Sequence, residues 1–340
     1  MRKTAYVVVA MLVAASMLLS ACAPKAEAPV ATEAPVVVAT EAPVEVAYGT
    51  ADNPIIMAMA PSATSETLTV GGAAIAAKLK ELTGYEFQVI IPTSYAALVE
   101  AMGSGNAHIG WLPPLAYLLA SQKGYAEVVA STLRRGSDTY GFQVIAPAAA
   151  GFTPYFDVAT NTVTGDAKTA LAQLDGKNWC ATDPLSASGY VLPGGVMKDA
   201  GFSPKKTAFL TGHPQIVVAL YSYVAGSKAN ICDYGTTYID ARTDASLVDL
   251  TDVTDKVVVI WRSDSFIPND NVSLAAGIPD DVKAKIVEAL LSLGSTPEGI
   301  EILAAAGYQI DGLKAVDDTF YDSLRVYLEA SGLDITSLVK

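Results

Sequence analysis

Histidine and cysteine are scarce in this chain, which has two histidines and three cysteines among its 340 residues. Neither the histidines nor the scattered carboxylates show the spacing of a metal site. The sequence also lacks a GxSxG nucleophile elbow, an HExxH helix, a Walker loop and a complete dinucleotide-binding fingerprint. We therefore expect a protein that is not an enzyme and that holds no metal and no cofactor.

Basic residues are also few, because 22 Lys and Arg stand against 35 Asp and Glu, for a formal net charge of −13. A nucleic-acid-binding surface normally needs a basic face, so we expect no nucleic-acid partner. The same net charge provides no long-range attraction for an anionic ligand. An anion would have to be held by local dipoles and hydrogen bonds.

Long hydrophobic runs are absent apart from one at the N-terminus, which is short for a membrane-spanning helix. Arg2 and Lys3 precede this apolar run over residues 6–19, and Cys22 follows two small residues. The pattern resembles a bacterial lipoprotein signal over residues 1–22, in which Cys22 carries lipid after cleavage. An ordinary secretory signal with a chance cysteine is the alternative. We expect an extracytoplasmic protein that is lipid-anchored to the cell membrane.

Residues 23–48 consist mainly of Ala, Pro, Val, Thr and Glu, and EAPV recurs at Glu27, Glu33 and Glu41. Repeated proline without a helical or strand period predicts an extended, disordered tether. The remaining residues are enough for two lobes of ordinary domain size.

Short apolar runs alternate with helical patterns along the rest of the chain. The predicted strands are 53–60, 85–91, 107–111, 126–133, 141–146, 178–182, 207–210, 230–234 and 257–261. The predicted helices are 65–82, 95–102, 114–121, 188–200, 214–225, 279–293, 297–306 and 317–330. This alternation predicts an α/β fold with two lobes, each a mainly parallel sheet flanked by helices.

Two chain crossings, near Val144 and Val258, would join the lobes. Residues 49–143 and 259–340 would form lobe 1, and residues 144–258 would form lobe 2. Ligands of open α/β sheets bind beyond the carboxyl ends of the strands, so the cleft between the lobes is the expected site.

Cys180 and Cys232 both lie in strand-like runs that we place in the same lobe. In an oxidising compartment they could form a disulfide. Two buried free thiols are the alternative, which we slightly favour because sequence spacing does not show that the two Cα atoms are close.

The segment DPLSASGYVLP, residues 183–193, follows a predicted strand and opens a predicted helix. It places the hydroxyls of Ser186 and Ser188 where free backbone N–H groups and the positive end of a helix dipole favour an anion. A serine in this position is as often simply the helix N-cap.

Several motifs in the same order resemble those of the phosphate, phosphite and phosphonate binding proteins of ABC importers, which have the type II periplasmic-binding fold. The likeness extends over nearly all of residues 53–330. It rests on TSYAALVEAMGSGNAHIGWLPPLAYLLA from Thr93, DTYGFQVI from Asp138, LDGKNWCATDPLSASGYVLPGGVMKDAGF from Leu174, TGHPQIVVAL from Thr211 and WRSDSFIPNDNV from Trp261. The resemblance implies a monomeric receptor that delivers a small oxyanion to an ABC permease and its ATPase.

The family's anion loop, usually Ser, Thr, Ser, Gly, corresponds here to Ser186, Ala187, Ser188 and the glycine that follows. Ala187 lacks the middle hydroxyl, so affinity or ligand choice could differ from that of other members. The resemblance also implies that Tyr95, Tyr140 and His213 donate hydrogen bonds to the anion.

Asp233 ends the predicted strand 230–234 and should point toward the cleft. The resemblance suggests that it holds a ligand ammonium, accepts a hydrogen bond from a protonated ligand oxygen, or only caps the next helix. His108 lies in a predicted strand away from these motifs, where a structural role is expected.

Pro113 and its neighbours Trp111 and Pro114 are expected at the cleft edge of the first lobe. Arg134 and Arg135 are assigned to a solvated loop rather than to an anion clamp. Residues 148–169 depart from the family pattern and suggest a surface insertion. Two alternatives stay open: a receptor of the same fold for a sulfonate or an uncharged compound, and a ligand sensor without transport.

Overall fold

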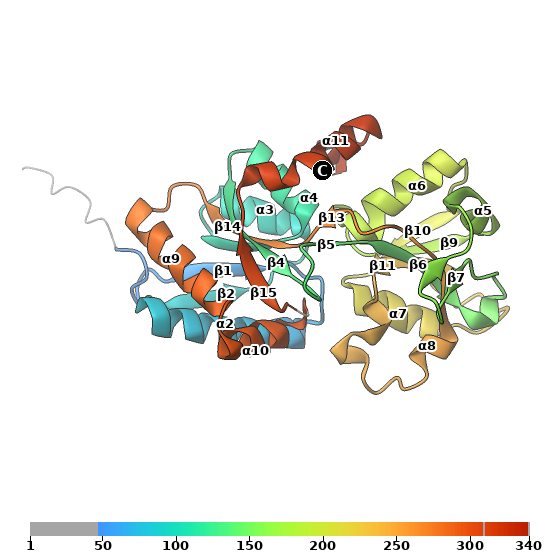
Figure 1. Cartoon of the computed structure of the whole chain (residues 1–340), viewed down its shortest axis with the longest axis horizontal. Coiled ribbons are helices and arrows are strands. Elements are labelled where there is room, and N and C mark those ends of the chain that lie inside the picture. Colours follow the sequence, from blue (N-terminus) through green and yellow to red (C-terminus); the bar gives the residue numbers. More distant parts are fainter. Residues whose placement is uncertain (1–46, 309, 339–340) are drawn as a thin grey trace, which may run out of the picture. The chain divides into compact units, whose positions relative to one another are not determined.

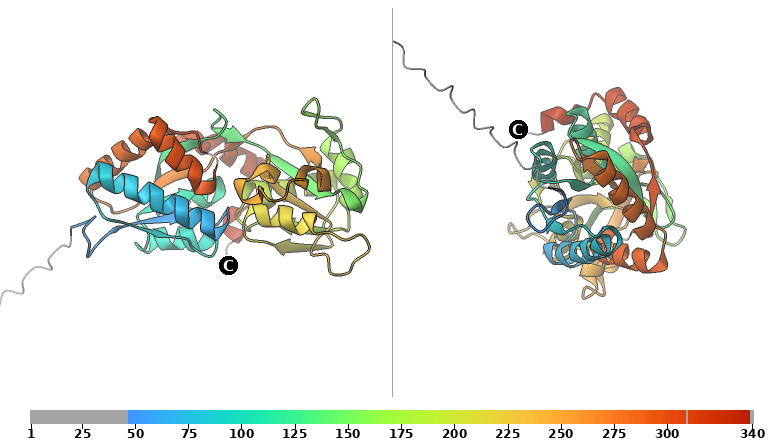
Figure 2. Two further views of the ribbon diagram at one scale, coloured as in Figure 1. Left: turned by 90° about the horizontal axis from the view of Figure 1, so that it is seen from below. Right: turned by 90° about the vertical axis from the view of Figure 1, so that its left-hand side faces the viewer.

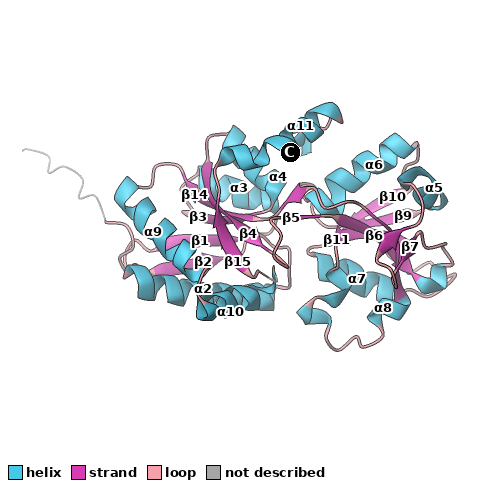
Figure 3. Ribbon diagram, in the orientation of Figure 1, coloured by secondary structure: helices cyan, strands magenta, loops and turns pink. Residues whose placement is uncertain are grey.

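The structure is a computed structural model that describes residues 47–308 and 310–338. The predicted signal segment 1–22 and the predicted tether, up to residue 46, lie outside the described residues. Two mixed sheets flanked by helices make up the described part (Figures 1 and 3). Within it, no helix combines the length and the apolar character needed to cross a bilayer.

The first sheet has the strand order β15-β4-β14-β3-β1-β2. Its strands are β1 (Ile55–Met59), β2 (Phe87–Ile90), β3 (Ile109–Leu112), β4 (Ala126–Leu133), β14 (Asn271–Ala275) and β15 (Gly312–Ala315). Strands β2 and β3 run parallel to β1, whereas β14 is antiparallel to both β3 and β4. Strand β15 pairs antiparallel with β4 at the edge.

Six α-helices flank the first sheet. They are α2 (Ser65–Thr83), α3 (Tyr95–Gly103), α4 (Pro114–Gln122), α9 (Asp280–Leu293), α10 (Pro297–Leu303) and α11 (Asp322–Ala330). Helix α2 packs against α9 and α10, and α3 packs against α4. In α2, Leu68, Ile75 and Leu79 recur at helical spacing and are fully buried, as expected for the core-facing stripe of an amphipathic helix.

The second sheet has the strand order β10-β9-β11-β6-β12. Its strands are β6 (Phe142–Pro147), β9 (Asn178–Ala181), β10 (Lys206–Phe209), β11 (Tyr234–Tyr238) and β12 (Val257–Arg262). Its α-helices are α5 (Ala167–Leu171), α6 (Leu192–Ala200), α7 (His213–Tyr221) and α8 (Val253–Lys256). The π-helical turn η3 (Ala187–Val191) leads into α6.

The α/β class with helix-flanked sheets agrees with the sequence prediction, but strand pairing is mixed instead of mainly parallel. In the second sheet, β9 runs parallel to β10 and β11, whereas β6 is antiparallel to β11 and β12. The chain enters this sheet along β6 and leaves it along the neighbouring β12, so these two strands must run in opposite directions.

Two connections join the sheets, one between β4 and β6 and one between β12 and β14. Within them, β5 (Thr139–Tyr140) pairs antiparallel with β13 (Ile267–Pro268). The two connections therefore lie side by side (Figures 1 and 2). Arg134 follows β4, Tyr140 ends β5, and Asp270 comes two residues after β13.

The segment 148–169 contains the two-stranded hairpin of β7 (Phe156–Asp157) and β8 (Thr162–Val163). It packs on the second sheet, where the Trp261 indole N–H donates to the Gly165 carbonyl at 3.2 Å.

The prediction of a strand over 230–234 was wrong by four residues, since β11 covers Tyr234–Tyr238. This strand contains Thr236 and Thr237, which make it look polar although both are fully buried. Hydrogen bonds compensate for their burial: the Trp179 indole N–H reaches Thr236 at 2.9 Å and the Gln143 amide reaches Thr237 at 3.2 Å.

Cys180 and Cys232 form a disulfide with a Cα–Cα distance of 5.5 Å, which corrects the preference for free thiols. Cys180 lies in β9, and Cys232 lies two residues before β11, the strand that pairs with β9. Because β11 begins at Tyr234, Cys232 lies in the loop before this strand and not in the predicted strand 230–234. The pairing of β11 with β9 brings this loop close to Cys180.

Loss of this disulfide should lower the free energy of unfolding. The bond joins two residues that are 52 positions apart in the sequence. A disulfide of this kind restricts the unfolded chain and typically stabilises the folded protein by about 2 to 4 kcal/mol. Urea unfolding of the wild type in the presence of reductant, compared with the Cys180→Ala/Cys232→Ala variant, tests this value. Reductant should shift the wild-type midpoint and leave the variant unchanged; an unchanged wild-type midpoint would contradict the assignment.

Candidate functional site

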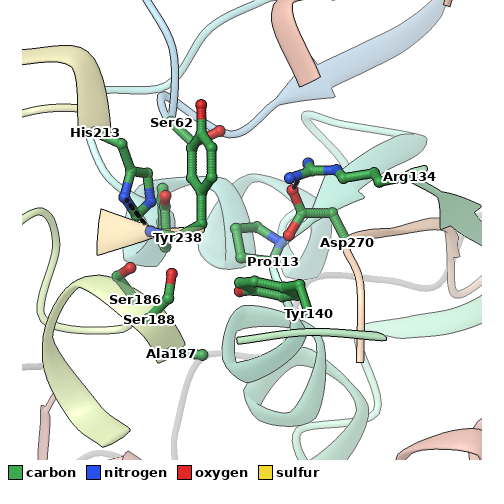
Figure 4. A pocket seen from close by; sticks show the side chains of 11 residues that line it. Ser62, Pro113, Arg134, Tyr140, Ser186, Ala187, Ser188, His213, Tyr238 and Asp270 are labelled. Atoms are coloured by element: carbon green, nitrogen blue, oxygen red, sulfur yellow. Dashed lines mark hydrogen bonds and ion pairs between the residues drawn. The ribbon is translucent and has the colours of Figure 1, made fainter. Parts of the chain in front are cut away.

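A small cavity is lined by residues that come from the segments around both sheets and from the connections between them (Figure 4). The space open to the centre of a water molecule is about 20 Å³, little more than one ordered water needs. Its lining residues are Ser62, Tyr95, Pro113, Arg134, Tyr140, Ser186, Ala187, Ser188, His213, Tyr238 and Asp270. Six of the seven ligand residues predicted from the sequence are thus brought together.

Helix N-termini from the helices around both sheets converge on this cavity. Tyr95 is the first residue of α3, His213 is the first residue of α7, and Ala187 is the first residue of η3. Pro113 is the N-cap of α4. The positive ends of helix dipoles gather at such termini, so the cavity favours an anion without a net positive charge.

The anion loop is fixed by its own hydrogen bonds. Ser186 Oγ accepts the Gly189 N–H at 3.0 Å, and the Gly189 carbonyl accepts the Thr236 hydroxyl at 2.7 Å. A Cβ at Gly189 would lie 2.0 Å from Thr182 Oγ1, so only glycine fits this packing. Ser186 is therefore both an N-cap and a cavity residue, and the two interpretations of this serine are compatible.

Two of the lining hydroxyls come from opposite walls of the cavity. Ser188 is almost fully buried in η3, and Tyr140 lies across from it on β5 (Figure 4). Burial raises the pKa of Tyr140, and the negative charge of Asp270 adds to the rise, while a hydrogen bond with Ser188 opposes it. The phenol therefore stays protonated and can donate.

His213 presents one ring nitrogen to the backbone and the other to the cavity. Its Nδ1 accepts the Tyr238 N–H at 3.3 Å (Figure 4). Since Nδ1 is an acceptor, the proton of the neutral ring is assigned to Nε2. Burial lowers the pKa of His213 to about 3, and the Arg134 charge contributes to the lowering. His213 is thus a neutral donor.

The prediction that Arg134 lies in a solvated loop was wrong for its side chain. This side chain lines the cavity and is only 16% exposed. Its Nη2 donates to Asp270 Oδ2 at 2.8 Å, whereas the neighbouring Arg135 is exposed. Burial raises the pKa of Asp270, although the Arg134 charge opposes the rise. This pair could not be predicted from the sequence, because the two residues are 136 positions apart and meet only through the β5 and β13 connections.

Ser62 and Tyr238 were also missed. Ser62 precedes α2 in a loop that carries no family motif. Tyr238 lay outside the predicted strand 230–234, whereas in the structure it is the last residue of β11. The Tyr238 hydroxyl donates to Asp244 at 2.9 Å, so its ring rather than its hydroxyl faces the cavity (Figure 4).

Asp233 does not reach the cavity. It lies at the start of β11, where its Oδ2 accepts the Asn178 N–H at 2.8 Å at the amino end of β9. The four-residue error in the strand position had put Asp233 at the carboxyl end. His108 is structural as expected, since its Nδ1 accepts the Ile56 N–H at 2.9 Å. No residue of the segment 148–169 lines the cavity.

Within the described residues, no three His, Cys, Asp or Glu side chains gather as metal ligands. What the arrangement can do is bind: it supplies hydroxyl, imidazole and backbone donors from both lobes around a small space.

Comparisons with known proteins were made by sequence and by structure. A family model described as "ABC transporter, phosphonate, periplasmic substrate-binding protein" matches residues 57–321. The phosphate-import protein PhnD of Mycolicibacterium smegmatis is 23% identical over 298 residues, which cover 82% of this chain and 86% of that protein. The phosphonates-binding periplasmic protein of Escherichia coli K12 is 22% identical over 233 residues, covering 68% of this chain and 63% of that protein.

Two solved structures share the fold. The binding-protein component of an ABC phosphonate transporter from Pseudomonas aeruginosa has a TM-score of 0.67 at 20% identity, covering 82% of this chain and 88% of that chain. PhnD1 from Prochlorococcus marinus in complex with methylphosphonate has a TM-score of 0.68 at 12% identity, covering 81% of this chain and 97% of that chain. These likenesses confirm the predicted fold class.

The buried, neutral His213 should make stability depend on pH. The pKa of His213 in the folded protein is about 3, below the ordinary value of 6.5. As the pH falls below 6.5, the unfolded chain therefore binds a proton at this residue before the folded protein does. The free energy of unfolding is then highest above pH 6.5 and decreases toward pH 3. Between pH 6.5 and 5 the loss from this group should be about 2 kcal/mol. Chemical denaturation of the wild type and the His213→Asn variant across this range measures the difference in slope; equal slopes would contradict a neutral His213.

Proposed function

This chain belongs to the family of periplasmic substrate-binding proteins of ABC phosphonate transporters, and from that premise we propose that it binds a phosphonate, phosphite or related phosphorus oxyanion in the cavity between its lobes and delivers it to a permease. The family is one of binding proteins, in agreement with the non-catalytic role predicted from the sequence.

The observation that carries the proposal is the set of donors around the cavity. Ser186, Ser188 and Tyr140 offer hydroxyls, and His213 offers a neutral Nε2–H. These groups and the helix N-termini can satisfy several oxygens of one tetrahedral anion. The cationic Arg134 is paired with Asp270, so hydrogen bonds and dipoles, rather than a net charge, would hold the ligand.

Ser62 supports the same function from the other lobe. Its hydroxyl is buried and has no hydrogen-bond partner within the part of the chain that the structure describes. A buried hydroxyl without a partner is costly, and a ligand oxygen would satisfy it. The small volume of the cavity also favours a ligand of few atoms over a sugar or a peptide.

Direct contacts already join the lobes beside the cavity. The Tyr95 N–H donates to Asp183 Oδ2 at 3.1 Å, and the His213 N–H donates to the Ser62 carbonyl at 3.3 Å. We assign the arrangement to a closed state, in which closure buries the ligand.

We place the lobe boundaries within residues 134–141 and 263–270, slightly outside the 144–258 expected from the sequence. The reason is that β6 and β12 belong wholly to the second sheet. The connections would then act as the hinge.

A ligand screen tests the proposed function. Calorimetry against phosphate, phosphite, methylphosphonate, 2-aminoethylphosphonate, sulfate and taurine should show binding of phosphorus compounds. The Ser188→Ala variant should lose about 1.5 to 3 kcal/mol of binding free energy, or roughly ten- to a hundredfold in affinity, because it loses a hydrogen bond to a charged oxygen.

The two histidines provide a matched pair of variants for the same screen. His213→Asn keeps an acceptor for the Tyr238 N–H but removes the donor at Nε2, so it should weaken binding. His108→Asn makes the equivalent change outside the cavity and should bind as the wild type does. A folded wild type that binds none of the phosphorus compounds, or equal affinities for all three variants and the wild type, would refute the proposal.

We also propose that Cys22 is lipidated and tethers the protein to the cell membrane. Fractionation of producing cells should find the wild type with the membranes until detergent is added. The Cys22→Ser variant, which has no thiol to acylate, should not be processed into this form, and metabolic labelling with a fatty acid should label only the wild type. Equal labelling of both proteins would exclude Cys22 as the lipid site.

A further inference from the structure

The carboxylate of Asp183 contacts segments that belong to both sheets. Asp183 lies two residues after β9 of the second sheet, at the start of the segment that contains the anion loop. Its Oδ1 accepts the Leu185 N–H at 2.8 Å, within the same loop. Its Oδ2 accepts the Tyr95 N–H at 3.1 Å, and Tyr95 is the first residue of α3, which flanks the first sheet. We call this second contact the Asp183 bridge.

The Asp183 bridge provides an acceptor that α3 lacks. The first N–H groups of a helix have no partner inside the helix. The N-cap residue Ser94 accepts the Ala97 N–H at 3.1 Å through its hydroxyl, so its side chain does not serve the Tyr95 N–H. A carboxylate at a helix N-terminus is also stabilised by the helix dipole. The bridge therefore favours the arrangement in which α3 and the anion loop lie together.

A second contact has the same form in the opposite direction. His213 is the first residue of α7, beside the second sheet, and its N–H donates at 3.3 Å to the carbonyl of Ser62, which precedes α2 beside the first sheet (Figure 4). The next residue, Pro214, has no N–H to offer. A residue from each sheet thus caps the first N–H of a helix beside the other sheet. The two contacts exist together only when these segments meet at the cavity.

Asp183 has a different position from the residues that we assign to ligand binding. It does not line the cavity, and an ionised carboxylate has no hydrogen to donate to an oxyanion. Burial raises the pKa of Asp183, although the N–H groups of Leu185 and Tyr95 oppose the rise. The cost of removing the carboxylate from water therefore offsets part of what the bridge contributes. The bridge then shifts the balance between open and closed arrangements and does not fix it.

We propose that Asp183 sets the ligand affinity without contacting the ligand, because it bridges to the Tyr95 N–H only in the closed arrangement. The inference rests on the proposed function and makes Asp183 a positioning residue for it. A ligand held by groups beside both sheets needs the closed arrangement, so its apparent affinity falls with the fraction of the protein that can close. A contact present only after closure should act mainly on the rate of ligand dissociation.

Asp183→Asn removes the bridge and keeps the contact within the loop. The asparagine carbonyl can accept the Leu185 N–H, and its amide then presents a second donor to the Tyr95 N–H. The dissociation constant for methylphosphonate should rise about tenfold. Most of this rise should come from faster dissociation, with an association rate within about threefold of the wild type. Stopped-flow tryptophan fluorescence measures both rates.

Asp166→Asn is the control variant. Asp166 is the N-cap of α5 and accepts the Thr169 N–H at 2.9 Å, but it does not line the cavity. The variant makes the same change of charge, and asparagine also caps helices well. Its rates should equal those of the wild type.

Asp183→Ala separates the bridge from simple support of the loop, because it removes both contacts of the carboxylate. It should weaken binding at least as much as Asp183→Asn does. If only the alanine variant binds more weakly, Asp183 supports its own loop alone and the inference is wrong. Tighter binding of methylphosphonate by Asp183→Asn would also overturn it, since Asp183 would then act as a charge that repels the anion.

Small-angle X-ray scattering of the ligand-free proteins tests the bridge without a ligand. The radius of gyration of Asp183→Asn should exceed that of the wild type and of Asp166→Asn, because fewer molecules are closed. Equal radii for the three proteins would overturn the inference and leave the proposed function standing. A wild type that binds no phosphorus oxyanion would refute the proposed function, and the scattering comparison would still decide whether the bridge favours closure.

Discussion

The free N–H groups at the starts of helices are the constraint on which this structure depends. Strands of both sheets lead into helices at the same central region, and each helix must leave its first backbone donors without partners inside the helix. In α3, η3 and α7 these ends meet around one small cavity. Under the proposed function, the positive ends of these helices would face one anion together, which is why a chain with a net charge of −13 would need no basic cluster to bind one.

Much of the fold and part of the site could be predicted from local sequence. The start of α3 at Tyr95 and the bounds of β4 follow from the sequence pattern, and six predicted ligand residues meet at one cavity. The predictions that failed concern contacts between segments that are far apart in the sequence. Strand β11 was misplaced because its buried threonines depend on Trp179 and Gln143 from other strands. The disulfide and the Arg134–Asp270 pair likewise exist only once distant segments are packed.

The Asp233 error shows how one such failure propagates. A shift of four residues moves a side chain from the carboxyl end of a strand to its amino end, away from the cavity. The acidic group of the cavity then comes from Asp270, in a connection that the sequence treats as a plain loop. The residues that the family resemblance indicated in loop motifs line the cavity, because their helix starts are local, but the resemblance could not supply a contact that depends on strand register.

The two connections between the sheets also line part of the cavity. Tyr140 ends β5, Arg134 lies between β4 and β5, and Asp270 follows β13, the strand that pairs with β5. Under the proposed function, a ligand that contacts Ser188 on η3 and Tyr140 in this connection would be held only when both lie at the correct distance. Binding energy then differs between open and closed arrangements, and that difference is what a ligand needs to shift the equilibrium toward closure. In this proposal, ligand recognition and closure would depend on the same few side chains.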